Sequence, residues 1–253
     1  TVHRCRRSIR ARIKVSNRKK KLLRRYDFYD QTSNHNHSKL EGSKTMAKLK
    51  VLQFSGGEIH NWQGVGNAVN DALKECDDFE ITRVDEDLDI FASDKLNDYD
   101  VVVYFYTVGE ITDAQFNGIS NFIKSGKGFV GIHSAADSFR GSPEWRSMVG
   151  GYFVTHPHFR AYQVSVLDDT HPITEGIDEF IVTDEQYITD YDSRNTILAT
   201  ALYKGVAQPV VWTKDWGEGR VAYIALGHDE GPARHETFKL MLNRATAWAA
   251  ASE

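Results

Sequence analysis

The stretch Gly128-Phe129-Val130-Gly131-Ile132-His133-Ser134-Ala135-Ala136-Asp137 decides the fold of this chain. Its apolar run ends at Ile132, and His133 and Ser134 follow at the point where a helix is expected to begin. A buried strand that turns sharply into a helix is typical of parallel α/β proteins, in which ligands bind at the carboxyl ends of the strands. Some folds place a Ser or Cys nucleophile at such a turn, so His133 is the first candidate for a functional residue.

Strand-like runs alternate with helical stretches on both sides of this turn. The continuous apolar run over 99–106 is expected of a strand that is buried on both faces. Apolar residues at helical spacing predict helices over 64–75 and 112–124, the second with Thr112 as N-cap. This alternation predicts an α/β fold with a parallel sheet and helices on both of its faces.

Two further expectations concern the chain after the turn. Residues 134–149 should be largely helical, with a break near Gly141, and Ser134 to Asp137 resemble a capping box in which Asp replaces Glu. Beyond Gly150 the pattern becomes β-rich and is expected to be partly antiparallel, before a closing helix. The strands expected there are 160–167, 180–183, 196–201, 209–213 and 220–226, and the closing helix is 235–250.

The charge distribution divides the chain into two parts. Residues 1–45 hold 14 Lys and Arg against 3 Asp and Glu, whereas residues 46–253 hold 17 against 32. The first part lacks the apolar periodicity needed to offset the entropy cost of ordering, so we expect a disordered basic tail followed by one α/β domain. The tail is interpreted first as an extension of the reading frame or an expression artefact; an organelle transit segment and a nucleic-acid patch remain alternatives.

Composition excludes several classes of protein. The chain has only Cys5 and Cys76, in unrelated contexts, which excludes a disulfide framework and a Cys-based zinc site and favours a reducing, cytoplasmic setting. No apolar run reaches the length of a membrane span, and the acidic body argues against a nucleic-acid-binding domain. A Gly-x-Gly-x-x-Gly pattern is missing, so no nucleotide is expected.

Histidines and a carboxylate recur just beyond apolar strands or in the loops that follow them. These candidates are His60, His133, His156, His228 and Glu185, with Asp184 as an alternative carboxylate. Imidazole and carboxylate together suit a divalent metal such as zinc, manganese or nickel, and they equally suit acid/base chemistry on a sugar. For each single histidine, a hydrogen-bonded structural role is the competing interpretation.

The order of short motifs along the body resembles the ThuA-like family, named for trehalose utilisation, within the class I glutamine amidotransferase-like superfamily. The matching pieces are Ser55-Gly56-Gly57 with His60, Gly131-Ile132-His133-Ser134-Ala135, Trp145, Gly150-Gly151, Phe153, His156-Pro157, His171-Pro172-Ile173, Asp184-Glu185 with Tyr187, Pro209-Val210-Val211-Trp212, Gly217, Gly219-Arg220-Val221, Tyr223 and Gly227-His228.

The resemblance implies a flavodoxin-like, doubly wound and mainly parallel sheet with a β-rich C-terminal half. It also implies a role in disaccharide or keto-sugar metabolism, with a small carbohydrate as partner. In amidotransferases of the superfamily a Cys nucleophile occupies the turn that here carries His133. Because an imidazole cannot form the glutamyl thioester, glutamine amidotransferase activity is disfavoured.

From this resemblance we expect a sugar isomerase or hydrolase type of activity. His133, His228 and Glu185 would be catalytic, and His60, His133, His156 and His228 would hold a divalent metal. His60, Gly57, Tyr187 and Trp212 would bind the substrate, the two aromatic residues by packing against the sugar. The alternative is a non-catalytic carbohydrate-binding or regulatory module. A homo-oligomer is left open.

Overall fold

The computed structural model describes residues 47–251. The expected basic tail over 1–45 therefore lies outside the described residues. From Lys48 onward the chain forms one compact unit. Among the described helices, none is long and apolar enough to cross a membrane.

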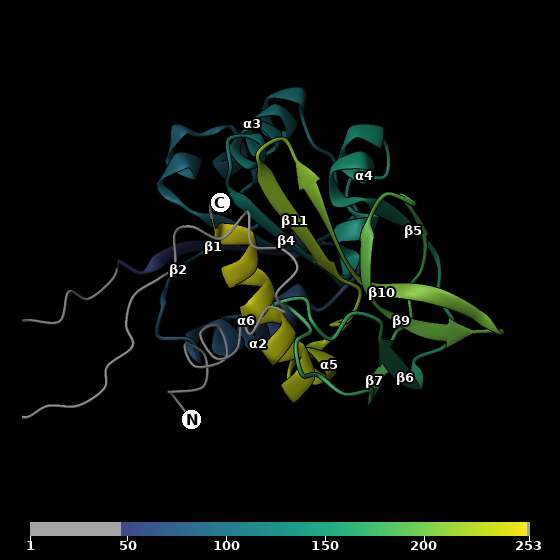
Figure 1. Ribbon diagram of the computed structural model, residues 1–253. Helices are drawn as coiled ribbons and strands as arrows, with labels where there is room; N and C mark the ends of the chain where they lie inside the picture. Colours follow the sequence, from purple (N-terminus) through teal and green to yellow (C-terminus); the bar gives the residue numbers. More distant parts are fainter. Residues whose placement is uncertain (1–46, 252–253) are drawn as a thin grey trace, which may run out of the picture. The chain divides into compact units, whose positions relative to one another are not determined.

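Five adjacent parallel strands form the core of a nine-stranded sheet, in the order β2-β1-β3-β4-β11 (Figure 1). The strand β3 is buried along its whole length, as its apolar run predicts. The bounds are β1 Leu49–Gly57, β2 Phe79–Asp85, β3 Val101–Thr107, β4 Gly128–Ile132 and β11 Gly219–Ile224.

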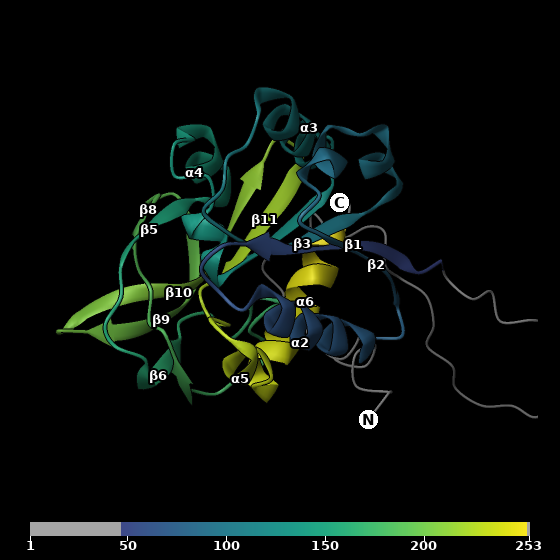
Figure 2. The same ribbon diagram turned by 180° about the vertical axis from the view of Figure 1, so that it is seen from behind.

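Helices cover both faces of these strands. In both views α2 and α6 lie on one side of the sheet, and α3 and α4 lie on the other (Figures 1 and 2). Helix α3 begins with a capping box in which Thr112 and Gln115 bond each other's backbone N–H groups, which confirms Thr112 as its N-cap. The bounds are α2 Trp62–Lys74, α3 Asp113–Lys124, α4 Pro143–Val149, α5 Glu230–Ala233 and α6 Glu236–Ala250, with short 3₁₀ helices η1 Leu88–Ala92 and η2 Asp94–Asp98.

The β-rich half extends the same sheet with antiparallel pairs, in the order β11-β10-β9-β6-β7. A separate two-stranded antiparallel sheet joins β5 and β8. The mainly parallel, flavodoxin-like α/β fold with a β-rich C-terminal half is therefore confirmed. The bounds are β5 Gly151–Thr155, β6 Arg160–Val166, β7 Phe180–Asp184, β8 Ile188–Tyr191, β9 Thr196–Tyr203 and β10 Val206–Trp216.

The turn after β4 differs from its expected form. The predicted break in the helix is present, because the 3₁₀ helix η3 (His133–Asp137) is separate from α4. The predicted Ser134 cap is wrong: η3 begins at His133 and has no side-chain cap. The Ser134 hydroxyl is instead buried, without a hydrogen-bond partner among the described residues. The tight turn starts two residues earlier than the capping pattern requires, with Ile132 in the N-cap position.

Candidate metal centre

Four of the predicted site residues meet at the carboxyl ends of the strands. His60 follows β1, His133 follows β4, Glu185 follows β7 and His228 follows β11. One nitrogen or oxygen from each of these side chains lies within 4.8 Å of the others. We call these four residues the ligand cluster. Strand direction explains why the three histidines converge, because the carboxyl ends of parallel strands in one sheet meet at one edge, whereas Glu185 joins them from the antiparallel part of the sheet.

His133 is held rigidly at the turn. Its side chain is fully buried and its backbone has φ +41°, a left-handed conformation that is uncommon for a residue with a side chain. Its Nδ1 lies 2.7 Å from the carbonyl oxygen of Ala225, so Nδ1 carries the proton and donates. The Tyr223 hydroxyl donates to the His133 carbonyl oxygen at 2.7 Å. In the neutral ring, Nε2 therefore has a free lone pair, and this nitrogen faces Glu185.

His60 is kept neutral by its surroundings. Burial, and then the nearby imidazoles of His133 and His228, lower the pKa of His60 from 6.5 to about 3. Its Nδ1 lies 2.6 Å from the Thr107 hydroxyl oxygen at the end of β3, which orients the ring. A neutral imidazole is the form that binds metals, so His60 has the right protonation state at physiological pH.

Glu185 is the anion of the cluster. Its Oε2 lies 3.0 Å from His228 Nδ1 and 3.4 Å from His133 Nε2. Burial alone would raise the pKa of Glu185, but the two imidazoles outweigh burial and lower it. For His228, burial lowers the pKa of the imidazole. The contact with Glu185 outweighs burial, so the pKa of His228 is raised overall.

The buried carboxylate of Asp184 ties two ligand-bearing loops together. It accepts backbone N–H groups from Glu185 at 2.8 Å, Gly227 at 2.7 Å and His228 at 3.2 Å. Strand β7 is at the edge of the sheet, four positions from β11, yet the Asp184 carboxylate reaches the loop after β11. Burial raises the pKa of Asp184 despite these three donors. The carboxylate thus fixes the backbone that presents Glu185 and His228.

His156 lies outside the ligand cluster, although it is expected among the metal ligands. Its Nδ1 contacts the other oxygen of Glu185, Oε1, at 3.0 Å, and its side chain is 40% exposed. Glu185 therefore lies between His156 and the other imidazoles. The loop places His156 at the solvent side of the carboxylate, where it contacts the cluster without adding a donor to it.

The residues expected to bind substrate are placed differently from one another. Trp212 is fully buried, its indole N–H donates to the Val149 carbonyl at 2.9 Å, and its ring stacks on Tyr223. It therefore has no free face for a sugar, and this expectation is wrong. Tyr187 is also buried, with its ring centroid 3.8 Å from that of His133, so it supports the imidazole. Gly57 has φ +100° and lets β1 pass close to β3 beside the His60 loop.

Three groups that contact the ligand cluster are not predicted from the sequence. The Ala225 carbonyl and the Thr107 hydroxyl orient His133 and His60, and Phe159 lies with its ring centroid 5.8 Å from that of His228. Only Thr107 has a signal in the sequence, since it ends a buried apolar run. A backbone carbonyl has no sequence signature, and the position of Phe159 depends on long-range pairing.

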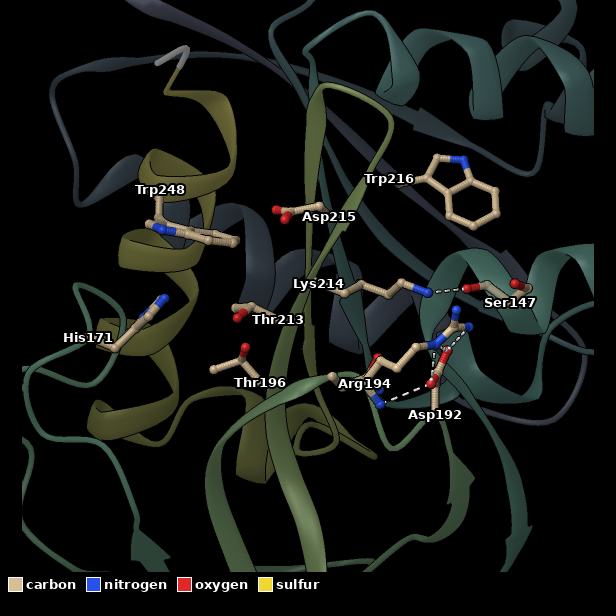
Figure 3. Close-up of a pocket in the computed structure, with 11 residues that line it drawn as sticks. Ser147, His171, Asp192, Arg194, Thr196, Thr213, Lys214, Asp215, Trp216 and Trp248 are labelled. Carbon is tan, nitrogen blue, oxygen red and sulfur yellow. Dashed lines mark hydrogen bonds and ion pairs between the residues drawn. The ribbon is translucent and has the colours of Figure 1, made fainter. Parts of the chain in front are cut away.

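A cavity of about 590 Å³ lies away from the ligand cluster (Figure 3). It borders the end of β10, where Trp216 pairs with Gly219 at the start of β11, so it is at the opposite end of the parallel strands. Its charged groups bind their neighbours: Lys214 donates to the Ser147 carbonyl, and Arg194 pairs with Asp192. No member of the ligand cluster lines it.

The ThuA family model, described as trehalose utilisation, matches residues 50–249. The chain belongs to the ThuA family. Family membership supports a role related to trehalose utilisation at the level of the family. Among curated proteins, no sequence matches the chain.

Solved structures agree with this assignment. A ThuA-like protein of Parabacteroides merdae superposes with a TM-score of 0.71 at 21% identity, covering 80% of this chain and 90% of that one. A ThuA-like protein of Bacteroides uniformis gives 0.68 at 20% identity, covering 83% and 95%. A cytoplasmic protein of Salmonella typhimurium LT2 gives 0.60 at 12% identity, covering 79% and 99%. At these identities the likeness shows the ThuA fold, and the chemistry must be argued from the chain's own residues.

Proposed function

We propose that this ThuA protein is a sugar-processing enzyme whose ligand cluster binds a divalent metal. The observation that carries the proposal is the donor set: three imidazoles and one carboxylate at the strand ends of an α/β sheet. His133 Nε2 and His228 Nδ1 are buried there without a hydrogen bond of good geometry among the described residues. Buried polar atoms normally have partners, and a cation bound beside the carboxylate would give both nitrogens one. The set suits zinc, manganese or nickel.

The chain's own residues prepare the site for this cation. The Ala225 carbonyl selects the tautomer of His133 that leaves Nε2 free, and the low pKa of His60 keeps that ring neutral. A hydrogen-bonded second contact of this kind orients a ligand and makes it more basic. A metal bound here would polarise a carbonyl or hydroxyl oxygen of the substrate. His156, at the solvent side of Glu185, is placed to contact a substrate that enters from outside.

The sugar class rests on the family description, and trehalose-type disaccharides and keto-sugars are the proposed substrates. The absence of a thiol at the turn supports chemistry other than glutamine hydrolysis, since His133 takes the position where an amidotransferase carries its nucleophile.

Metal analysis of the purified full chain tests the proposal. We expect one divalent ion per chain after incubation with zinc, manganese or nickel. The ion should be lost in His133→Ala and His228→Ala and kept in His171→Ala, a matched histidine outside the cluster. His133→Ala should also abolish turnover of the sugar while the far-ultraviolet circular dichroism stays native. A wild-type chain that binds none of the three metals contradicts the proposal, and sugar binding without metal or turnover would favour a non-catalytic module.

A further inference from the structure

Phe159 is an exposed aromatic side chain beside the ligand cluster. It is 45% exposed, and its ring centroid lies 5.8 Å from that of His228 with the planes inclined by 53°. The two aromatic residues expected to meet a sugar, Tyr187 and Trp212, are buried. Of these three rings, only that of Phe159 offers a substantial face to a ligand.

The backbone around Phe159 is anchored on both sides. Before it, His156 contacts Glu185 Oε1 at 3.0 Å, and Pro157 restricts the backbone of the loop. After it, Arg160 pairs with Asp184 in the ladder between β6 and β7. Arg160 also donates to the Gln186 side-chain oxygen at 3.1 Å. Phe159 is therefore held beside the cluster, and a ligand that binds it does not have to order a mobile loop.

Two other exposed apolar side chains lie close in the sequence to histidines of the site. Ile59 is 63% exposed and directly precedes His60, and Val154 is 53% exposed and precedes His156 by two residues. The exposed ring of Phe159 thus lies beside a polar group of imidazoles and one carboxylate. A ligand that suits both needs an apolar face and polar groups at its edge.

A cyclic sugar has this chemistry, because its C–H groups form an apolar face and its hydroxyls project from the edge. We propose that Phe159 is the stacking platform of the site and that one sugar ring packs its C–H face on this phenyl ring. The hydroxyls at the edge of the same ring would then face the ligand cluster. This inference rests on the proposed function, and it replaces Trp212 and Tyr187 as the aromatic contact.

Sugar binding to the full chain tests the platform, with trehalose as the probe and titration calorimetry as the measurement, with and without zinc. Packing against an aromatic ring contributes about 0.5–1.5 kcal/mol, so Phe159→Ala should weaken trehalose binding by between about twofold and about twelvefold. Phe159→Tyr keeps the ring and should bind within about twofold of wild type. Leu167→Ala removes an exposed apolar side chain just beyond the opposite end of β6 and should bind like wild type. Sorbitol, an open-chain polyol without a ring face, should bind no more weakly to Phe159→Ala than to wild type.

The platform is overturned if Phe159→Ala binds trehalose as tightly as wild type, or if wild type binds no trehalose with or without zinc. Zinc content is measured on every sample and separates this outcome from failure of the proposed metal function. Zinc binding without dependence of sugar affinity on Phe159 refutes only the platform. Sugar binding that depends on Phe159 in a chain that holds no metal supports the platform and refutes the metal centre.

Discussion

Replacing Asp184 with Asn tests whether one buried carboxylate holds the ligand cluster together. The wild-type carboxylate accepts three backbone N–H groups, from Glu185, Gly227 and His228. An Asn of the same shape has one acceptor oxygen and turns an NH₂ group toward at least one of these donors. Leaving a buried donor unsatisfied costs about 1–3 kcal/mol, and the remaining bonds lose their charge assistance.

We therefore expect Asp184→Asn to lose roughly 2–4 kcal/mol of stability, which lowers the Tm of a domain this size by roughly 5–15 °C. Metal affinity should fall about 10- to 100-fold, because the backbone that presents Glu185 and His228 is no longer fixed. Calorimetry gives the Tm, and titration with Co²⁺ gives the affinity together with an absorption spectrum that reports ligand geometry. The difference between variant and wild type should shrink in acid, since a protonated Asp184 resembles Asn.

Asp192→Asn is the matched control for this experiment. The Asp192 carboxylate also accepts a backbone N–H, from Arg194 at 3.0 Å, but it lines the cavity shown in Figure 3, away from the ligand cluster. Its substitution should leave metal affinity and the Co²⁺ spectrum unchanged. An Asp184→Asn protein with wild-type Tm and metal affinity would show that the three hydrogen bonds do not position the cluster.

The remaining predictions concern pH and packing. In metal-free protein, the pKa of His60 is about 3 in the folded chain and 6.5 in the unfolded chain, so the contribution of His60 to stability is lost as the pH falls from 6.5 toward 3. The pKa of His228 is raised in the folded chain, so its contribution to stability is lost as the pH rises above 6.5 and the folded imidazolium deprotonates. In thermal melts, His60→Gln should weaken the dependence of Tm on pH below 6.5, and His228→Gln should weaken it above 6.5. Variants with the same pH dependence as wild type would contradict these pKa shifts. Trp212→Phe removes the indole N–H that the Val149 carbonyl accepts, so it should lower the free energy of unfolding in urea melts by about 1–3 kcal/mol and leave sugar affinity unchanged. A loss of sugar affinity without a loss of stability would instead show that Trp212 binds the sugar. Gly57→Ala puts a Cβ into the backbone of β3 at a left-handed φ, so it should destabilise by more than 1 kcal/mol; a variant as stable as wild type refutes the close approach.

Much of the fold follows from local patterns in the sequence. The apolar run at β3 and the helical spacing before Lys124 predict elements whose neighbours in the chain also become neighbours in space. The rule that ligands bind at strand ends then nominates His60, His133 and His228. The fold prediction is confirmed because it depends on a few adjacent residues, and the three histidines lie close together because parallel strands share one direction.

Other features depend on pairing between distant segments. Alternation in a strand does not say which face a large aromatic side chain packs against, so Trp212 can look like a ligand contact and yet be buried between sheet and helix. The position of Asp184 beside the loop after β11 depends on the pairing of four further strands, β10, β9, β6 and β7, in the right order. The capping pattern at Ser134 is a local signal that the tight turn at His133 overrides.

The spread of the ligand cluster along the chain has a consequence for folding. Its members run from residue 60 to residue 228, so no short fragment contains them all, and the cluster exists only when both halves of the domain have docked. An ion that binds this cluster but not the unfolded chain would stabilise the whole cooperative unit, by about 2.7 kcal/mol at a hundred times its Kd. Closing such long loops is slow, so the ion would bind late, after the domain has folded, and would not nucleate folding.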